Sequence, residues 1–115
     1  KDSSLPQRVS ACLPSDEAFN NWSIAQATSG YSKLSAELIA FCCQLRRDHN
    51  ISTEPVYTGK ALHLLIELIK KGALADVKRV AFFHTGGLQG LHGLYYRKLL
   101  TTEQYQLLAE ESAMM

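Results

Sequence analysis

The stretch VAFFHTGG, at residues 80–87, decides the predicted fold. It opens with four apolar residues that show no alternation, which is typical of a strand buried on both faces of a parallel sheet. It ends in a polar turn with two glycines. Ligands of open α/β sheets bind outside the carboxyl ends of the strands, so this turn is a candidate binding loop.

Two helical patterns precede this stretch. From about residue 33 to residue 47 the apolar residues form one stripe, and either Ser32 or Ser35 can cap it. A second helix is predicted to begin at about Thr58, because apolar residues then recur every three or four positions. Gly72 can close this helix in the left-handed conformation.

Weaker patterns occur before and after these elements in the sequence. Residues 88–100 resume a helical pattern, and Thr101 or Thr102 can cap a last helix that runs to residue 108. Residues 8–13 and 22–27 are candidates for short strands. The well-supported centre is therefore helix, strand, glycine turn, helix.

That order predicts an α/β fold, in which the chain forms part of a doubly wound, mainly parallel sheet. Three strands would leave the apolar faces of several helices poorly covered. We therefore expect the sheet to be completed by strands that this chain does not contain.

The composition fits one ordinary soluble globular domain, residues 1–115, with no separate second domain. The 115 residues are 46% hydrophobic and 20% charged, with a formal net charge of +1. This charge predicts neither nucleic acid nor an anionic membrane as a partner. No apolar run approaches the roughly 18 residues that span a bilayer. The first residue is Lys1 and no signal peptide follows it, so we expect part of a longer, cytoplasmic protein.

The cysteines and histidines predict no metal site and no catalytic thiol. The three cysteines include the adjacent pair Cys42 and Cys43, which makes a poor disulfide framework and suits reduced, half-buried thiols. The histidines His49, His63 and His92 are scattered and have no metal-ligand spacing.

Two segments contain residue types suited to a ligand. The first, PVYTGK at residues 55–60, places Tyr57, Thr58 and Lys60 beside a helix N-terminus, an arrangement that suits an anion or a cofactor. Gly59 lets another group approach the backbone closely. The alternative is structural: Thr58 caps the helix and Lys60 is merely exposed.

The second segment is HTGGLQG, residues 84–90, directly after the predicted strand. It would place a hydroxyl and free backbone N–H groups at a ligand. It lacks the Gly-Lys-Ser/Thr ending of a P-loop and the GxGxxG spacing, so nucleotide binding is disfavoured. The alternatives are a turn without a ligand and, for His84, a structural histidine with satisfied hydrogen bonds.

Together the two segments resemble the D-cysteine desulfhydrase and 1-aminocyclopropane-1-carboxylate deaminase family, which belongs to the tryptophan-synthase-β-like, fold type II enzymes of pyridoxal 5'-phosphate (PLP). The resemblance runs from about residue 29 to residue 95. It includes EPVYTGKA at 54–61, ELI at 67–69 and FHTGG at 83–87.

The resemblance implies a PLP cofactor and assigns roles to five residues. Tyr57 is implied as the catalytic residue beside cofactor and substrate. Thr58 and Thr85 are implied to approach the pyridine nitrogen, and Gly86 and Gly87 to leave room for the ring. Deaminases of the family resemble one another in carrying Glu and Leu at the positions of the two threonines. A neutral hydroxyl makes a weaker electron sink than a carboxylate, which is adequate for β-elimination.

The predicted function is therefore that of a PLP-dependent lyase resembling D-cysteine desulfhydrase, which releases sulfide from D-cysteine and gives pyruvate and ammonia. The first alternative is 1-aminocyclopropane-1-carboxylate deaminase, or another amino-acid deaminase of the same family. The second is a non-catalytic α/β binding module.

Three functional parts of such an enzyme are missing from the sequence. They are the lysine that forms the Schiff base, the acid/base serine and the loop that grips the cofactor phosphate. Lys60 belongs to the YTGK element and is not that lysine. We therefore expect this chain to be the C-terminal part of an enzyme, inactive alone, whose partners are the remaining N-terminal part and a small amino-acid substrate. The resemblance also implies a homodimer when the enzyme is complete.

Overall fold

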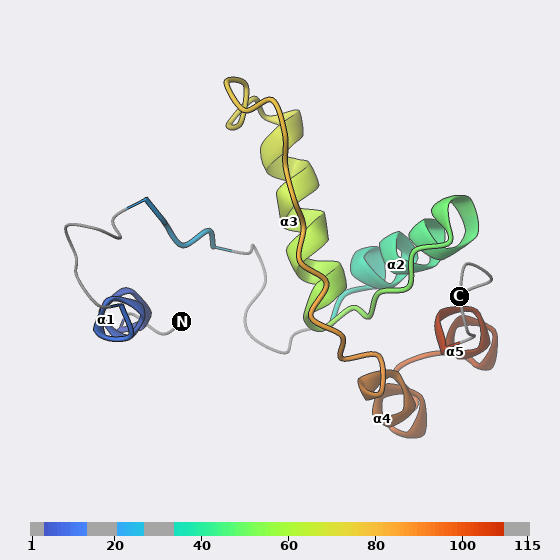
Figure 1. Ribbon diagram of the computed structural model, residues 1–115. Helices are drawn as coiled ribbons and strands as arrows, with labels where there is room; N and C mark the ends of the chain where they lie inside the picture. Colours follow the sequence, from blue (N-terminus) through green and yellow to red (C-terminus); the bar gives the residue numbers. More distant parts are fainter. Residues whose placement is uncertain (1–3, 14–20, 27–33, 110–115) are drawn as a thin grey trace. The chain divides into compact units, whose positions relative to one another are not determined.

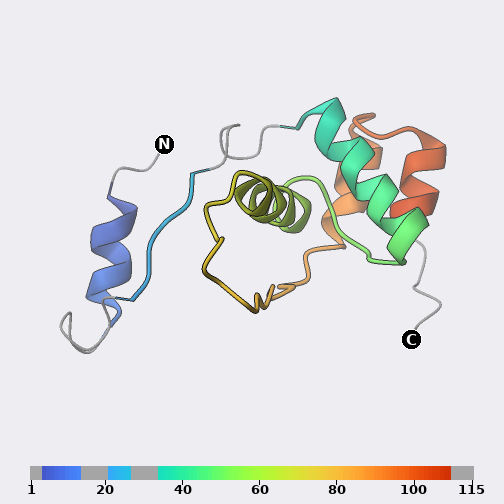
Figure 2. The ribbon, with the colours of Figure 1, turned by 90° about the horizontal axis from the view of Figure 1, so that it is seen from above.

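The computed structural model describes residues 4–13, 21–26 and 34–109 of the chain. These residues form five α-helices and no β-strand (Figures 1 and 2). The chain divides into two compact units, Lys1–Tyr31 and Ser32–Met115. None of the helices in the described ranges combines the length and the apolarity needed to cross a lipid bilayer.

The described part of the first unit consists of helix α1 (Leu5–Ala11) and an irregular segment at residues 21–26. The strand predicted at residues 8–13 is therefore wrong. Pro6 lies in the first turn of α1, where its fixed φ favours a helix and its missing N–H costs nothing. The strand predicted at 22–27 is also absent from residues 22–26, and residue 27 lies outside the described part.

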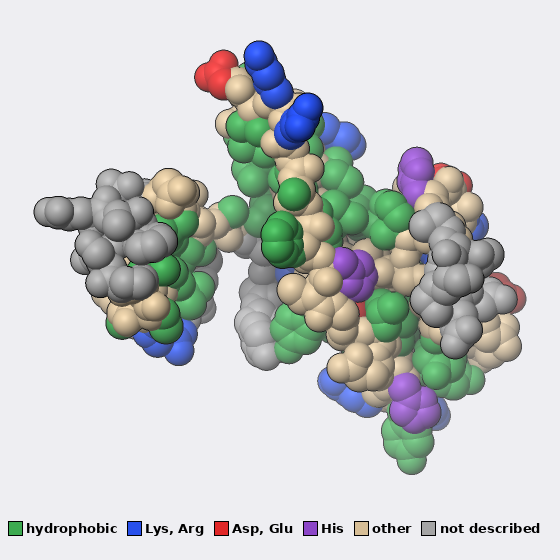
Figure 3. All heavy atoms as spheres, in the orientation of Figure 1, with side chains coloured by type: hydrophobic (Ala, Val, Ile, Leu, Met, Phe, Trp, Pro, Cys, Tyr) green, Lys and Arg blue, Asp and Glu red, His purple; other side chains and the backbone are tan. Residues whose placement is uncertain are grey.

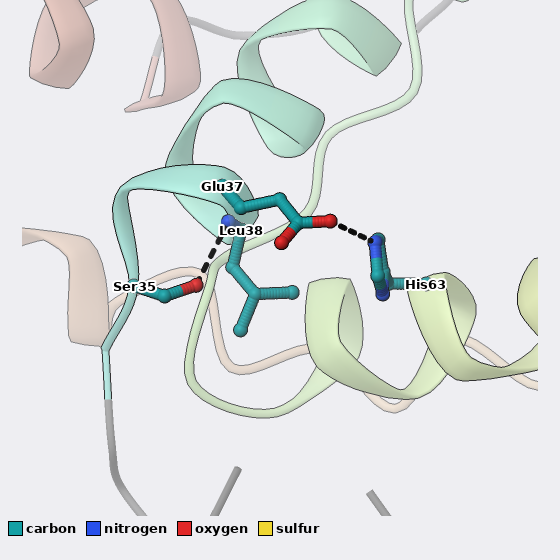
Figure 4. Close-up of polar contacts among 4 residues, drawn as sticks. All are labelled: Ser35, Glu37, Leu38 and His63. Carbon is teal, nitrogen blue, oxygen red and sulfur yellow. Dashed lines mark hydrogen bonds and ion pairs between the residues drawn. The ribbon is translucent and has the colours of Figure 1, made fainter. Parts of the chain in front are cut away.

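The second unit begins with helix α2 (Ala36–His49), which confirms the predicted helix. The Ser35 hydroxyl accepts a hydrogen bond from the Leu38 backbone N–H at 3.1 Å, so Ser35 is the cap (Figure 4). Ser32 lies outside the described residues. The helix ends at Asn50, which adopts the left-handed conformation with a φ of 55°.

Helix α3 (Thr58–Lys70) is also confirmed. Gly72, with a φ of 79°, ends it, and the next N–H donates to the Leu68 carbonyl at 3.0 Å. The α2–α3 contact includes His63 of α3, whose Nε2 lies 3.4 Å from a carboxylate oxygen of Glu37 (Figure 4).

Helices α4 (Gly90–Tyr96) and α5 (Thr102–Ala109) follow. Helix α4 is shorter than the predicted 88–100. The predicted cap of the last helix is confirmed at Thr101: its hydroxyl accepts from the Gln104 N–H at 3.1 Å, and the Gln104 side chain accepts from the Thr101 N–H at 2.8 Å. This capping box fixes the start of α5.

The hydrophobic core of the second unit lies between α2, α4 and α5. Burial of their apolar faces is the main force that holds these short helices together, because helices of this length are marginal alone. The buried residues of the cluster are Ile39, Cys42, Cys43, Leu91, Leu94, Leu100 and Leu108.

The predicted doubly wound α/β fold is contradicted, since the described residues form only helices and irregular segments. The strand predicted at 80–83 is instead part of an irregular connection that leads from the end of α3 to α4 (Figure 1). Val80 is 48% exposed and Phe83 is 83% exposed. A strand needs neighbours to pair its backbone, and no described segment pairs with this one. Figure 3 shows further hydrophobic side chains at the surface of α3.

Candidate functional site

The start of α3 is organised by the side chain of Glu54, which is 2% exposed. Its carboxylate folds back over the two following residues and accepts hydrogen bonds from three backbone N–H groups. The N–H of Thr58 donates to Oε1 at 2.6 Å, that of Tyr57 to Oε1 at 2.8 Å, and that of Val56 to Oε2 at 2.7 Å. The first N–H groups of a helix lack intrahelical partners and favour a negative charge, so this carboxylate caps the helix.

The Thr58 side chain also forms hydrogen bonds with Glu54. Its hydroxyl lies 3.2 Å from Glu54 Oε1, to which it donates, and it accepts from the Glu54 backbone N–H at 3.1 Å. Thr58 is 3% exposed and is the first residue of α3, so it is not the N-cap that the structural alternative supposed. A hydroxyl has one proton and two lone pairs, so one lone pair of Thr58 is left.

These contacts change what the helix N-terminus can do. The sequence suggested that it could receive an anion or a cofactor, but Glu54 already supplies the negative charge there. An external phosphate would have to displace this carboxylate. The α3 N-terminus is therefore closed to a second anion.

Gly59 confirms the close approach that the sequence predicted, and the structure identifies the approaching groups. A Cβ atom at this position would lie 2.7 Å from the Glu54 carbonyl oxygen and would also collide with the Cys42 sulfur. The Gly59 N–H donates to the same carbonyl at 2.8 Å. The close neighbour is thus the protein itself.

The glycine turn at residues 84–87 is anchored beside this loop by His84. Its Nε2 lies 2.6 Å from the Ser52 carbonyl oxygen, and its Nδ1 accepts from the Gly86 N–H at 3.1 Å. The ring therefore donates at Nε2 and accepts at Nδ1, which is the neutral tautomer. Both ring nitrogens have partners, which supports the structural interpretation of His84.

The two segments meet at Glu54. Gly86 and Gly87 have φ values of 89° and 85°, a conformation that L-residues rarely adopt. A Cβ atom built on Gly87 would lie 3.8 Å from Glu54 Oε1, whereas one built on Gly86 would meet nothing within 4 Å. The open side of the turn is therefore at Gly86.

The structure thus brings the five predicted site residues into two adjacent segments, but it exposes them unequally. Tyr57 is 53% exposed and Thr85 is exposed, whereas Thr58 is buried. Glu54 was not among the predicted site residues. The available signal was an acidic residue four positions before the start of a helix, where negative charge is favourable.

Cys42 and Cys43 belong to the hydrophobic core next to this site. Burial raises the pKa of the Cys42 thiol to about 11, and burial also raises the pKa of Cys43. A raised pKa keeps a thiol protonated and unreactive. No cluster of three or more histidine, cysteine, aspartate or glutamate residues that could hold a metal ion occurs among residues 4–13, 21–26 and 34–109.

Comparison with protein-family models gives no match, and no solved structure matches the chain. Curated proteins do match. A protein of Pyrococcus horikoshii named "Putative 1-aminocyclopropane-1-carboxylate deaminase" is 37% identical over 60 residues, which are 52% of this chain and 18% of that protein. The 1-aminocyclopropane-1-carboxylate deaminase of Rhizobium rhizogenes is 35% identical over 60 residues, 52% of this chain and 17% of the enzyme.

The enzyme of the same name from Pseudomonas syringae pv. syringae is 32% identical over 56 residues, which are 49% of this chain and 16% of the enzyme. The match thus spans less than one fifth of the length of these relatives. It confirms the resemblance to this family. The chain is partly homologous to the 1-aminocyclopropane-1-carboxylate deaminases, a family of fold type II PLP enzymes, and matches a small portion of them.

Proposed function

We propose that this chain supplies one wall of the cofactor and substrate site of a PLP-dependent enzyme that acts on a small amino acid. One observation carries the proposal. The segments at 54–58 and 84–87, which begin 30 positions apart in the sequence, meet through Glu54 and the bond from His84 to Ser52. These are the two segments that the family resemblance had singled out.

The residues present fit one side of a flat ring. The turn is open at Gly86, where even an added Cβ would meet nothing within 4 Å. Tyr57 and Thr85 are exposed, so a ligand at this surface could contact them. Thr58 donates its hydroxyl proton to Glu54, so toward a ligand it can act only as an acceptor, through its remaining lone pair.

PLP, when bound, accepts the electron pair released as a bond to the substrate Cα breaks. In our proposal the Tyr57 phenol holds or moves a proton beside the substrate. By the family resemblance, the Thr58 and Thr85 hydroxyls would lie on the side of the ring nitrogen, and Gly86 and Gly87 would leave room for the ring. The covalent lysine and the phosphate loop come from the remaining part of the enzyme.

Two activities are candidates, and different observations favour them. The names of the matching relatives favour 1-aminocyclopropane-1-carboxylate deaminase, which we take as the first candidate. Thr58 and Thr85 favour D-cysteine desulfhydrase, because by resemblance the deaminases carry Glu and Leu at these positions. A weaker electron sink suits elimination of a thiolate, which carries electrons away itself.

A chimera tests the proposal and separates the candidates. The matching segment of about 60 residues replaces its counterpart in the Rhizobium rhizogenes enzyme. Ammonia release from 1-aminocyclopropane-1-carboxylate supports the first candidate, and sulfide release from D-cysteine supports the second. A folded chimera that loses cofactor absorbance would contradict the proposal and favour a non-catalytic module. The chain alone, mixed with PLP, should show no internal aldimine absorbance at about 410–420 nm.

A further inference from the structure

We infer that Glu54 is the positioning residue of this site: its buried carboxylate sets the backbone of Tyr57 and Thr58 and the distance between the two site segments. This inference rests on the proposed function, which gives those two segments their role. It adds a residue to which neither the resemblance nor the relatives assign a task.

The Glu54 carboxylate accepts hydrogen bonds from three backbone N–H groups and one hydroxyl. Oε1 accepts from the N–H of Tyr57, from the N–H of Thr58 and from the Thr58 hydroxyl; Oε2 accepts from the N–H of Val56 and, at 3.1 Å, again from that of Tyr57. Bonds to an ionised acceptor are stronger than neutral ones. One side chain therefore fixes three consecutive backbone N–H groups.

Glu54 also holds the Thr58 side chain, through two hydrogen bonds. Its hydroxyl donates to the carboxylate and accepts from the Glu54 backbone N–H. Hydrogen bonds in a chain polarise one another, so donation to a carboxylate makes the hydroxyl oxygen a better acceptor. Glu54 thereby sets both the place and the acceptor strength of the remaining Thr58 lone pair.

The Glu54 carboxylate also lies close to the glycine turn at residues 84–87. The carboxylate lies on the side of Gly87 where a Cβ would stand, and His84 ties the same turn to Ser52, two residues before Glu54. Glu54 is thus a side chain that borders both segments. A change in its size or charge alters both at once.

The test compares Glu54→Gln with a matched control, Glu67→Gln, which removes the same charge from the last turn of α3, away from its N-terminus. Gln keeps one acceptor oxygen but presents an NH₂ group to backbone donors, so half of the cap is lost. In the full chain, amide hydrogen exchange at Val56, Tyr57 and Thr58 should become at least about tenfold faster in Glu54→Gln. Glu67→Gln should leave these three amides unchanged.

Two further variants keep the test informative if Glu54→Gln folds poorly. Glu54→Asp retains the carboxylate and should restore part of the protection. Glu54→Ala leaves space where the carboxylate was, and added formate should restore protection at these amides. Unchanged exchange at residues 56–58 in Glu54→Gln, or rescue by neither Asp nor formate, would overturn the inference.

The chimera separates positioning from capping alone. Glu54→Gln in an active chimera should lower kcat and shift the absorbance maximum of the bound cofactor, while Glu67→Gln does neither. If exchange rises but kcat and the spectrum stay unchanged, Glu54 is only a helix cap and the positioning role is refuted. If the unsubstituted chimera folds but binds no cofactor, the proposed function fails instead, and the exchange result still stands as a measurement of the cap.

Discussion

Replacing Gly59 with alanine should destabilise the second unit by about 2 kcal/mol or more, although alanine is the better helix former. The added Cβ would lie 2.7 Å from the Glu54 carbonyl oxygen and would also collide with the Cys42 sulfur. A backbone carbonyl cannot rotate away as a flexible side chain can. Its shift would also disturb the 2.8 Å bond from the Gly59 N–H.

The magnitude follows from three opposing effects. Overpacking a tight site costs about 1–3 kcal/mol. Disturbing the backbone hydrogen bond costs about 1 kcal/mol more. The higher helix propensity of alanine stabilises the helix by up to about 1 kcal/mol. The net loss is a large part of the stability of a small folded unit.

Urea unfolding followed by far-UV circular dichroism measures this loss, and Gly93→Ala is the matched control. A Cβ on Gly93, within α4, would meet nothing within 4 Å, so this substitution should stabilise the chain by about 0.5–1 kcal/mol. The double variant Gly59→Ala/Cys42→Ala should lose less than the sum of the two single losses, because the sulfur collision is gone. A loss below about 0.5 kcal/mol in Gly59→Ala would refute the close packing of Gly59 against Glu54.

Three further predictions concern the stability of the second unit. Gly72→Ala should cost about 1 kcal/mol in urea unfolding, because its φ of 79° is strained for alanine although space is open around it. Thr101→Ala should cost about 1 kcal/mol by removing the α5 cap, and Thr101→Ser should restore most of it. The free energy of unfolding should fall as the pH rises from about 9 to about 11, because the unfolded chain loses the Cys42 proton before the folded chain does. In Cys42→Ala this part of the pH dependence should vanish, whereas Cys12→Ala, which changes an exposed cysteine, should keep it.

The helices of the second unit were predictable because their signals are local. An apolar stripe, with Ser32 or Ser35 as its cap, predicted α2, and a second stripe with Gly72 predicted α3. Thr101 or Thr102 was predicted to cap α5, and the structure shows that Thr101 does so through its bonds with Gln104. Each signal acts within a few residues, so sequence alone contains it.

The strand predictions were wrong because strand formation depends on distant parts of the chain. An apolar run such as residues 80–83 is compatible with a strand, but pairing depends on segments elsewhere in the chain. The described residues provide no such pair, and Phe83 remains at the surface. At residues 8–13 the error was local, because Pro6 in the preceding turn was a helix-start signal that the strand interpretation ignored.

The site residues Tyr57, Thr58 and the glycine turn remain predictions from the sequence. Of the features predicted around them, the close approach at Gly59 is confirmed. The sequence could not show which atoms approach, because that requires the backbone path around the buried Pro55. That path turns Glu54 back onto the helix it precedes.

This self-capping limits where a cofactor phosphate can bind in the proposed enzyme. A phosphate at the α3 N-terminus would meet the Glu54 carboxylate within a buried space, and two anions there would repel each other. If the proposal holds, the negative end of the cofactor would be held away from α3, and its ring would approach Gly86, where the turn is open. The chain can then supply the ring side of the site without supplying the phosphate side. This division agrees with our expectation that the phosphate loop and the Schiff-base lysine belong to the remaining part of the enzyme.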